Sequence, residues 1–390
     1  MKLLVVLSRF PYPLEKGDKL RAYHQIRVLS RQHDIYLFAL SDTEVPASSM
    51  EALNPFCKEI RVGRIYWWTK LTNSLRAFFK GWPIQCGYFY SSEAKKALRQ
   101  FADEVKADAI YAQLVRTVPY VQELKGEKTI DYQDVFSQGM LRRAQRAPFW
   151  QKPFFKMESR RLRRYEAEVF PLFQHHTIIT EVDRDLMPVK DKDKISIVGN
   201  GVDFERYKYD GQEKIYDLIF AGNMSYAPNV DAAEFIVKQI LPGLLPQFPN
   251  LRLVLCGTNP APRVRALQGP HVTVTGWVES IAEYYAQSKI FIAPMRLGTG
   301  LQNKLLEAMA TQLPCVTSPL AGKPLKGAVP QQDLLICSTP DDYIAAITRL
   351  LTDSTHYQQI SQQGYQYVKG HYSWEVMTGV MSDELLVLLR

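Results

Sequence analysis

Residues 294–316, PMRLGTGLQNKLLEAMATQLPCV, constrain the fold more than any other stretch of this chain. The apolar run that precedes them, 290–293, is typical of a buried strand. A turn with Gly298 and Gly300 follows, and residues 304–310 are strong helix formers. Strand, glycine loop and helix together predict an α/β unit in which a helix N-terminus offers free backbone N–H groups to an anion.

Lys304 and Glu307 stand three residues apart, so they share one face of this expected helix. A cation beside phosphates and a carboxylate that accepts ribose hydroxyls together describe a site for a nucleotide diphosphate. The alternative is an exposed, solvated pair, which stabilises a helix by only about 0.2–0.5 kcal/mol. Both interpretations remain open at this point.

The segment GTGLQNKLLEAMATQLPCVTS resembles the nucleotide-sugar segment of the glycosyltransferase group 1 family, retaining enzymes of GT-B architecture. It is similar to a subgroup that reads R-x-G-x-G-x-x-x-K-x-x-E. The matching residues are Arg296, Gly298, Gly300, Lys304 and Glu307. Many members carry a further Glu in the glycine loop, where this chain has Thr299. Because this Glu is missing, the contacts to the donor sugar are expected to differ from those of such members.

The resemblance implies an α/β fold of GT-B type, with two Rossmann-like domains that face each other across a cleft. The expected acceptor domain spans 1–205, and the expected nucleotide-sugar domain spans 206–374. A C-terminal helix at about 375–390 is expected to return to the first domain. A chain of 390 residues is long enough for two domains of ordinary size.

The resemblance also implies which residues bind the donor. These candidates are Gly17, Gly222, Asn223, Trp277, Val278, Gly298, Thr299, Gly300, Leu301, Lys304 and Glu307. Many members have Gly-Arg after the first strand of the second domain, whereas here Asn223 follows Gly222. We therefore expect Lys304 to carry more of the phosphate binding. The candidate catalytic residues are Lys304, Glu307, Arg296 and Asp134.

Polar residues follow several expected strands of the first domain. Arg21 lies one turn into the expected helix 19–31, while Gln113 and Arg116 follow the strand 109–112. We expect these three on the acceptor side. Asp131 and Asp134 close the strand 128–131 and are candidates for the cleft, although both could be no more than helix caps.

Two segments of the first domain mix aromatic and basic residues. Residues 58–80 carry a net charge of +5 and residues 142–164 carry +8, so the rest of this +8 chain has a net −5. Such a mixture suits a membrane interface or lipid head group, single-stranded nucleic acid, or a helix with core aromatics and solvated cations. We expect an anionic membrane surface as the partner, and no nucleic acid. The residues expected on that side include Trp67, Trp68, Arg76 and Lys80.

Five scattered cysteines without a C-x-x-C pair indicate a reducing cytoplasm and neither a disulfide framework nor a zinc site. The opening MKLLVVLS is too short for a signal sequence, and no apolar run approaches 18 residues. We expect a cytoplasmic protein that is peripheral on the inner face of the cell membrane. The acidic triplets at 183–185 and 191–193 could bind a metal ion, as such triplets do in some transferases. In GT-B folds, however, a helix dipole and a cation offset the charge of the leaving diphosphate. No metal or cofactor is therefore expected.

The expected function is metal-independent transfer of a hexosyl group from a UDP or GDP sugar to a glycan or lipid-linked glycan, with retention, in cell-surface polysaccharide or glycoconjugate synthesis. The missing Glu motivates one alternative, a non-catalytic nucleotide-sugar-binding scaffold of a polysaccharide assembly system. A second alternative, an NAD-type oxidoreductase, is disfavoured because the first βα loop lacks G-x-G-x-x-G.

Overall fold

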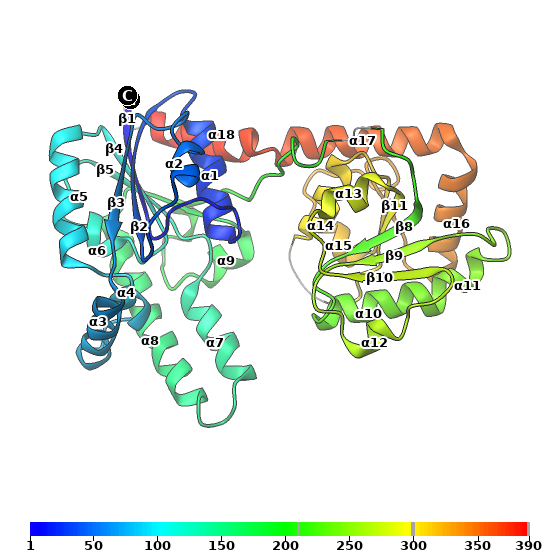
Figure 1. The fold of residues 1–390 in the computed structure, drawn as a ribbon, viewed down its shortest axis with the longest axis horizontal. Helices are drawn as coiled ribbons and strands as arrows, with labels where there is room; N and C mark the ends of the chain where they lie inside the picture. The colour runs from blue at the N-terminus through cyan, green and yellow to red at the C-terminus, as the bar shows by residue number, and fades with distance from the viewer. Residues whose placement is uncertain (209–210, 298–300, 388–390) are drawn as a thin grey trace. The chain divides into compact units, whose positions relative to one another are not determined.

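The computed structural model describes residues 1–208, 211–297 and 301–387. The chain forms two compact domains (Figure 1). The N-terminal domain comprises Met1–Asn200 and the segment that begins at Trp374, and the C-terminal domain is Gly201–Ser373. The chain thus changes domain at residues 200 and 373, a few residues before the expected boundaries.

The N-terminal domain is built on a sheet of seven strands in the order β3-β2-β1-β4-β5-β6-β7, in which every described pair is parallel. The strands are β1 Lys2–Leu7, β2 Asp34–Ser41, β3 Glu59–Arg64, β4 Ala109–Gln113, β5 Glu127–Asp131, β6 His175–Ile178 and β7 Ile195–Ile197. Alternate residues of β1 enter two separate apolar clusters, one on each face. Both faces are therefore covered, which is the usual state of a parallel sheet.

Helices cover both faces of this sheet (Figure 1). They are α1 Gly17–Leu29, α2 Ala47–Glu51, α3 Trp67–Lys80, α4 Ile84–Tyr88, α5 Ser92–Val105, α6 Val118–Val121, α7 Phe136–Arg146, α8 Lys152–Val169, α9 Glu181–Leu186 and α18 Trp374–Val387. Helix α18 packs on α1, where Trp374 stacks on His24 at 4.8 Å between ring centroids. Of the described helices, none combines the length and apolar character needed to cross a membrane.

A buried ion pair connects α1 to the centre of the sheet. The guanidinium of Arg21 donates from Nε and Nη2 to Asp131 at 2.7 and 3.1 Å, and from Nη1 to the Gly199 carbonyl at 3.0 Å. The hydroxyls of Tyr111 and Thr177 donate to the same carboxylate, each at 3.0 Å. Arg21 and Asp131 are fully buried. The structure therefore places both in the domain interior, and the expectation that they face an acceptor or a cleft is wrong.

The C-terminal domain is built on six strands in the order β10-β9-β8-β11-β12-β13, and its described pairs are also parallel. The strands are β8 Tyr216–Ala221, β9 Leu253–Cys256, β10 Val272–Gly276, β11 Ser288–Ala293, β12 Cys315–Thr317 and β13 Leu335–Ile336. The strand order reverses between β8 and β11. At such a point the loops after neighbouring strands diverge, and ligands bind in the crevice between them.

The helices of this domain begin with α10, Ala227–Phe235, which continues through a π-helical turn, Ile236–Ile240, into α11, Leu241–Leu244. The others are α12 Pro262–Arg265, α13 Ile281–Ala286, α14 Asn303–Ala310, α15 Pro319–Gly322, α16 Pro340–Thr352 and α17 Ser354–Tyr372. Strand β11, helix α14 and strand β12 confirm the strand, helix and strand predicted around 294–316. Gly298, Thr299 and Gly300 lie outside the described residues.

Replacing Arg21 by Met should lower the free energy of unfolding of the N-terminal domain by about 3–5 kcal/mol, because it leaves the Asp131 carboxylate buried and unpaired. Urea titration followed by circular dichroism measures this loss. The double variant Arg21→Met/Asp131→Leu should recover part of it. Arg31→Met, which removes an exposed pair with Glu375, serves as the control and should cost less than about 1 kcal/mol. A loss of similar size in both single variants would contradict the prediction.

Candidate functional site

Lys304 lies in the first turn of α14 with its ammonium partly buried at the carboxyl edge of the sheet. Nζ donates to Asn229 Oδ1 at 2.6 Å and lies 4.7 Å from the centroid of the Phe220 ring. Burial lowers the pKa of Lys304 to about 8. The alternative of an exposed, solvated Lys304–Glu307 pair is wrong, because both side chains are partly buried.

The bond between Lys304 and Asn229 joins the first turns of two helices, α14 and α10. Nδ2 of Asn229 donates to the Asn223 carbonyl at 2.9 Å, so the amide oxygen is the atom that faces the ammonium. First turns of helices carry unpaired backbone N–H groups and a partial positive charge. Two such turns and an ammonium that bonds a neutral amide place positive charge at this corner, and the nearby Glu307 carboxylate offsets part of it. This arrangement suits a phosphate group.

Two glycines line the floor beneath this corner. Gly222 follows β8 with φ of +154°, and a Cβ there would lie 2.7 Å from Asn229 Nδ2 and 3.2 Å from Lys304 Nζ. Gly257 follows β9 with φ of +145°, and its Cβ would lie 1.7 Å from the Gly222 carbonyl oxygen. A side chain at either position would strain the backbone and collide with its neighbours. The floor is therefore built of main chain.

Glu307 lies one turn further along α14, on the face of Lys304. The hydroxyl of Tyr285 donates to Glu307 Oε2 at 3.3 Å, and Tyr207 is a second hydrogen-bond partner. Burial raises the pKa of Glu307, and these hydrogen bonds oppose the rise. The carboxylate is thus held in a fixed place by tyrosines of the same domain.

Sequence reasoning missed Asn229, Tyr285 and Tyr207. Asn229 is 5% exposed, but its burial gives no signal in the sequence, because Asn is common at helix N-termini. The two tyrosines carried no local signal, because Tyr285 is 22 residues from Glu307 in the sequence.

The other donor candidates of this domain lie in several places. Arg296 forms a two-pronged ion pair with Asp231 at 3.0 and 2.6 Å and covers the Phe235 ring at 4.5 Å. Trp277 is 72% exposed and lines a shallow hollow of about 510 Å³. Val278 and Leu301 are half-buried, whereas Asn223 is exposed. Val278 and Leu301 pack against the apolar core, and Asn223 Oδ1 accepts from the Ser225 amide at 3.0 Å.

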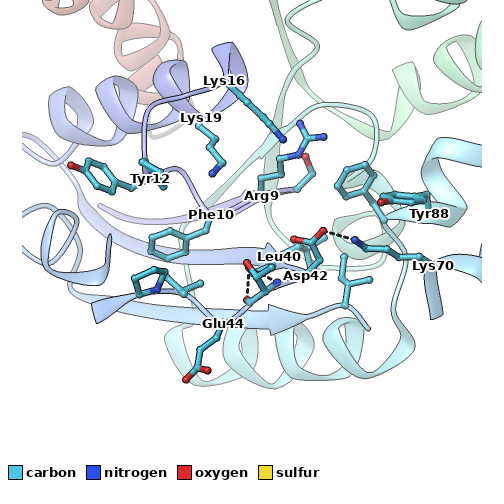
Figure 2. Close-up of a pocket in the computed structure, with 18 residues that line it drawn as sticks. Arg9, Phe10, Tyr12, Lys16, Lys19, Leu40, Asp42, Glu44, Lys70 and Tyr88 are labelled. Carbon is cyan, nitrogen blue, oxygen red and sulfur yellow. Dashed lines mark hydrogen bonds and ion pairs between the residues drawn. The ribbon is translucent and has the colours of Figure 1, made fainter. Parts of the chain in front are cut away.

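A pocket of about 370 Å³ lies in the N-terminal domain at the carboxyl ends of β1 and β2 (Figure 2). Aromatic rings and cations line it. They include Arg9, Phe10, Tyr12, Lys16, Lys19, Lys70, Tyr88 and Phe89. Lys70 pairs with Asp42, and Arg9 pairs with Asp18 at 2.5 Å. Gly17 begins α1 beside this pocket, and open space lies where its Cβ would be.

Gln113 and Arg116 hold parts of this domain together. Gln113 is buried and donates from Nε2 to the Asp18 carbonyl at 3.3 Å. Arg116 donates from Nε to Gln85 Oε1 at 3.1 Å and contacts the Phe89 ring at 4.6 Å. Burial lowers the pKa of Arg116 to about 10.

Asp134 is exposed, unlike Asp131, and its carboxylate forms an ion pair with Arg142 at 3.4 Å. Partial desolvation raises the pKa of Asp134. Helix α7 has no side-chain cap, so Asp134 is not the helix cap that the sequence left open. Thr180 caps α9 by accepting a hydrogen bond from the Asp183 N–H. Within the described residues no group of His, Cys, Asp and Glu is arranged to hold a metal ion.

Comparison with solved structures defines the fold class. The glycosyltransferase from Rickettsia africae ESF-5 aligns with a TM-score of 0.63 at 10% identity, over 100% of this chain and 98% of that one. HepE of Anabaena, solved in complex with UDP, aligns with a TM-score of 0.63 at 12% identity, over 99% and 100%. The fold is therefore α/β of GT-B type, with two Rossmann-like parallel-sheet domains, as predicted.

Sequence comparison adds a family and a relative. Residues 216–353 match the family described as glycosyl transferases group 1. An uncharacterized 44.6 kDa protein in the cps region of Klebsiella pneumoniae is 21% identical over 407 residues, which cover 98% of this chain and 99% of that protein. The family match includes Lys304, Glu307 and Arg296, whereas the N-terminal pocket lies outside it.

Binding of UDP to the whole chain should weaken as the pH rises through about 8, because the Lys304 ammonium loses its proton there. A phosphate favours the protonated form, so the affinity is full below that pH and falls above it. Calorimetry between pH 7 and pH 9.5 measures this. In Lys304→Arg the side chain stays charged, and affinity should decline less. Lys238→Met, on the exposed side of the same domain, is the control. If the unaltered chain binds UDP with the same affinity at pH 7 and at pH 9.5, the prediction is wrong.

Proposed function

We propose that the protein is a glycosyltransferase that moves a hexosyl group from a nucleotide-diphosphate sugar to a glycan or lipid-linked glycan. The bond between the anomeric carbon and the diphosphate oxygen breaks, and a bond to an acceptor hydroxyl oxygen forms. The products are the extended acceptor, the nucleoside diphosphate and the proton of that hydroxyl. Retention at the anomeric carbon is part of the proposal and rests on the resemblance of the donor segment.

One observation carries this proposal, namely the Lys304 ammonium held between the first turns of α10 and α14. Negative charge grows on the diphosphate as the sugar leaves. Fixed positive charge at that oxygen lowers the barrier, because it needs no reorganisation during the reaction. We assign Lys304 and the two helix ends to this role, so the proposed reaction is independent of a metal ion.

We assign Glu307 to the ribose of the nucleotide. A carboxylate accepts hydrogen bonds from both ribose hydroxyls, and Glu307 lies one turn from the proposed phosphate site on the same helix face. Trp277 and Val278, which follow β10, are the candidates beside the base. HepE, a structural neighbour, is solved with UDP and with UDP-glucose, which supports a donor of the UDP class over the GDP class.

We assign the acceptor to the N-terminal pocket, because its aromatic rings can stack on sugars and its cations can bind acidic groups. The relative in a cps region supports a role in cell-surface polysaccharide synthesis. All five cysteines are free, which fits a reaction on the inner face of the cell membrane. Arg296 and Asp134 remain candidate catalytic residues. For Arg296, contact with the donor requires its ion pair with Asp231 to open.

Lys304→Ala should lower kcat/KM by roughly 10- to 150-fold, the equivalent of a charged hydrogen bond of about 1.5–3 kcal/mol. Part of the loss should fall on kcat, because the interaction strengthens as the leaving group gains charge. Release of UDP from UDP-sugars, with membrane extract as the source of acceptor, measures it. If the unaltered chain binds UDP and releases none from any donor, the scaffold alternative replaces the proposal.

Glu307→Gln should weaken UDP binding while leaving pyrophosphate binding unchanged, because pyrophosphate has no ribose. Lys304→Ala should weaken both ligands. Calorimetry with the two ligands therefore separates the two roles. Tyr285→Phe is the matched control, since it removes one hydrogen bond to Glu307 and keeps the carboxylate. Parallel losses of UDP and pyrophosphate in Glu307→Gln would refute the ribose assignment.

A further inference from the structure

Helix α3 presents its large apolar side chains to solvent. The exposed residues are Trp67, Trp68, Leu71, Leu75, Phe78 and Phe79. At 3.6 residues per turn they occupy an arc of about 120°. The opposite face contacts the domain, where Ala77 is buried and Asn73 donates to the Tyr90 carbonyl at 2.9 Å. The expected alternative of core aromatics is therefore wrong for this helix, with Phe79 82% exposed and Trp67 72% exposed.

The tip of the α7–α8 hairpin is a second exposed apolar point. Phe149 is 83% exposed, and Trp150 and Phe154 beside it are exposed as well. Further along α8, a shallow hollow of about 590 Å³ is lined by five cations and by no carboxylate. These cations are Arg160, Arg163, Arg164, Lys190 and Lys192. The hollow is a concentrated positive surface.

Helix α3 and the hairpin tip lie at one edge of the sheet. Helix α3 follows β3 and the hairpin follows β5, and in a parallel sheet the carboxyl ends of all strands lie at the same edge. The hollow lies towards the opposite edge, because α8 leads into β6 and residues 187–192 lead into β7. Figure 1 shows α3 and the hairpin projecting beyond that edge. The two elements also touch, because Arg161 of α8 donates to the Phe78 carbonyl at 2.9 Å and its guanidinium lies 5.2 Å from the Phe78 ring centroid.

We infer that α3 and the hairpin tip form one surface that docks the N-terminal domain on an anionic lipid bilayer. Tryptophan and phenylalanine on an exposed helix face insert between head groups, while lysine and arginine bind anionic lipids. Each cation close to such a surface strengthens binding about fivefold. Exposed cations flank the apolar residues, with Arg76 and Lys80 on α3 and Lys156 near the start of α8.

Docking would place the N-terminal pocket at the lipid surface. Lys70, on the inner face of α3, lines that pocket, and Tyr88 of α4 lies beside it in Figure 2. A glycan carried on a lipid would then reach the pocket without leaving the bilayer. This consequence rests on the proposed function. The docking itself does not, because binding to vesicles is measured without donor or acceptor.

Co-sedimentation of the full chain with vesicles tests the inference. We expect at least tenfold tighter binding to phosphatidylcholine vesicles that contain phosphatidylglycerol than to pure phosphatidylcholine at low salt, and a smaller difference at high salt. Trp67→Ser/Phe79→Ser should weaken binding at least tenfold, and Arg76→Glu/Lys80→Glu should remove the preference for anionic lipid. Val380→Ser on α18 and Lys106→Glu after α5 are matched controls, since both residues are exposed and Lys106 precedes β4 at the opposite edge of the sheet.

Several results would overturn the inference. Equal binding to neutral and anionic vesicles at low salt would show that the cations do not contact lipid. Unchanged binding in both double variants, with folding verified by circular dichroism, would place any lipid contact elsewhere. Tighter binding to single-stranded oligonucleotide than to vesicles would assign the surface to nucleic acid. Self-association that Trp67→Ser/Phe79→Ser abolishes would make it a contact between copies of this chain.

Discussion

Parallel pairing of the strands decides where chemistry is possible in this protein. Every described pair in both sheets is parallel, so the segments after the strands of a domain all emerge at one edge. In the C-terminal domain that edge receives Gly222, Gly257 and the first turns of α10 and α14. In the N-terminal domain it receives the pocket, α3 and the α7–α8 hairpin. The sites differ in chemistry, yet the same constraint on strand direction positions all of them.

The elements were predictable from the sequence because their signals are local. The strand Ala109–Gln113 ends one residue beyond the predicted strand 109–112, and α14 begins one residue before the predicted helix. The partners of the functional residues were not predictable. Arg21 and Asp131 are 110 residues apart, and Lys304 and Asn229 are 75 apart. Such contacts depend on how helices pack on the sheet, which apolar periodicity does not specify.

Two features are unfavourable for the stability of the fold, and each lies at a site to which we assign a function. Lys304 is partly buried beside a neutral amide, although a buried ammonium opposes folding, as the lowered pKa of Lys304 records. Helix α3 turns its apolar face outward, although that face would stabilise the domain if it were buried. Local conflicts of this kind are expected where selection acts on binding, at some expense of stability.

The contact between the glycine loops after β8 and β9 also bears on engineering. Because the main chain at Gly257 approaches the Gly222 carbonyl so closely, the floor of the positive corner cannot be reshaped by side chains from below. Libraries that aim to change the donor should leave both glycines alone. They should instead vary the residues around Trp277, which is exposed and leaves room for new side chains.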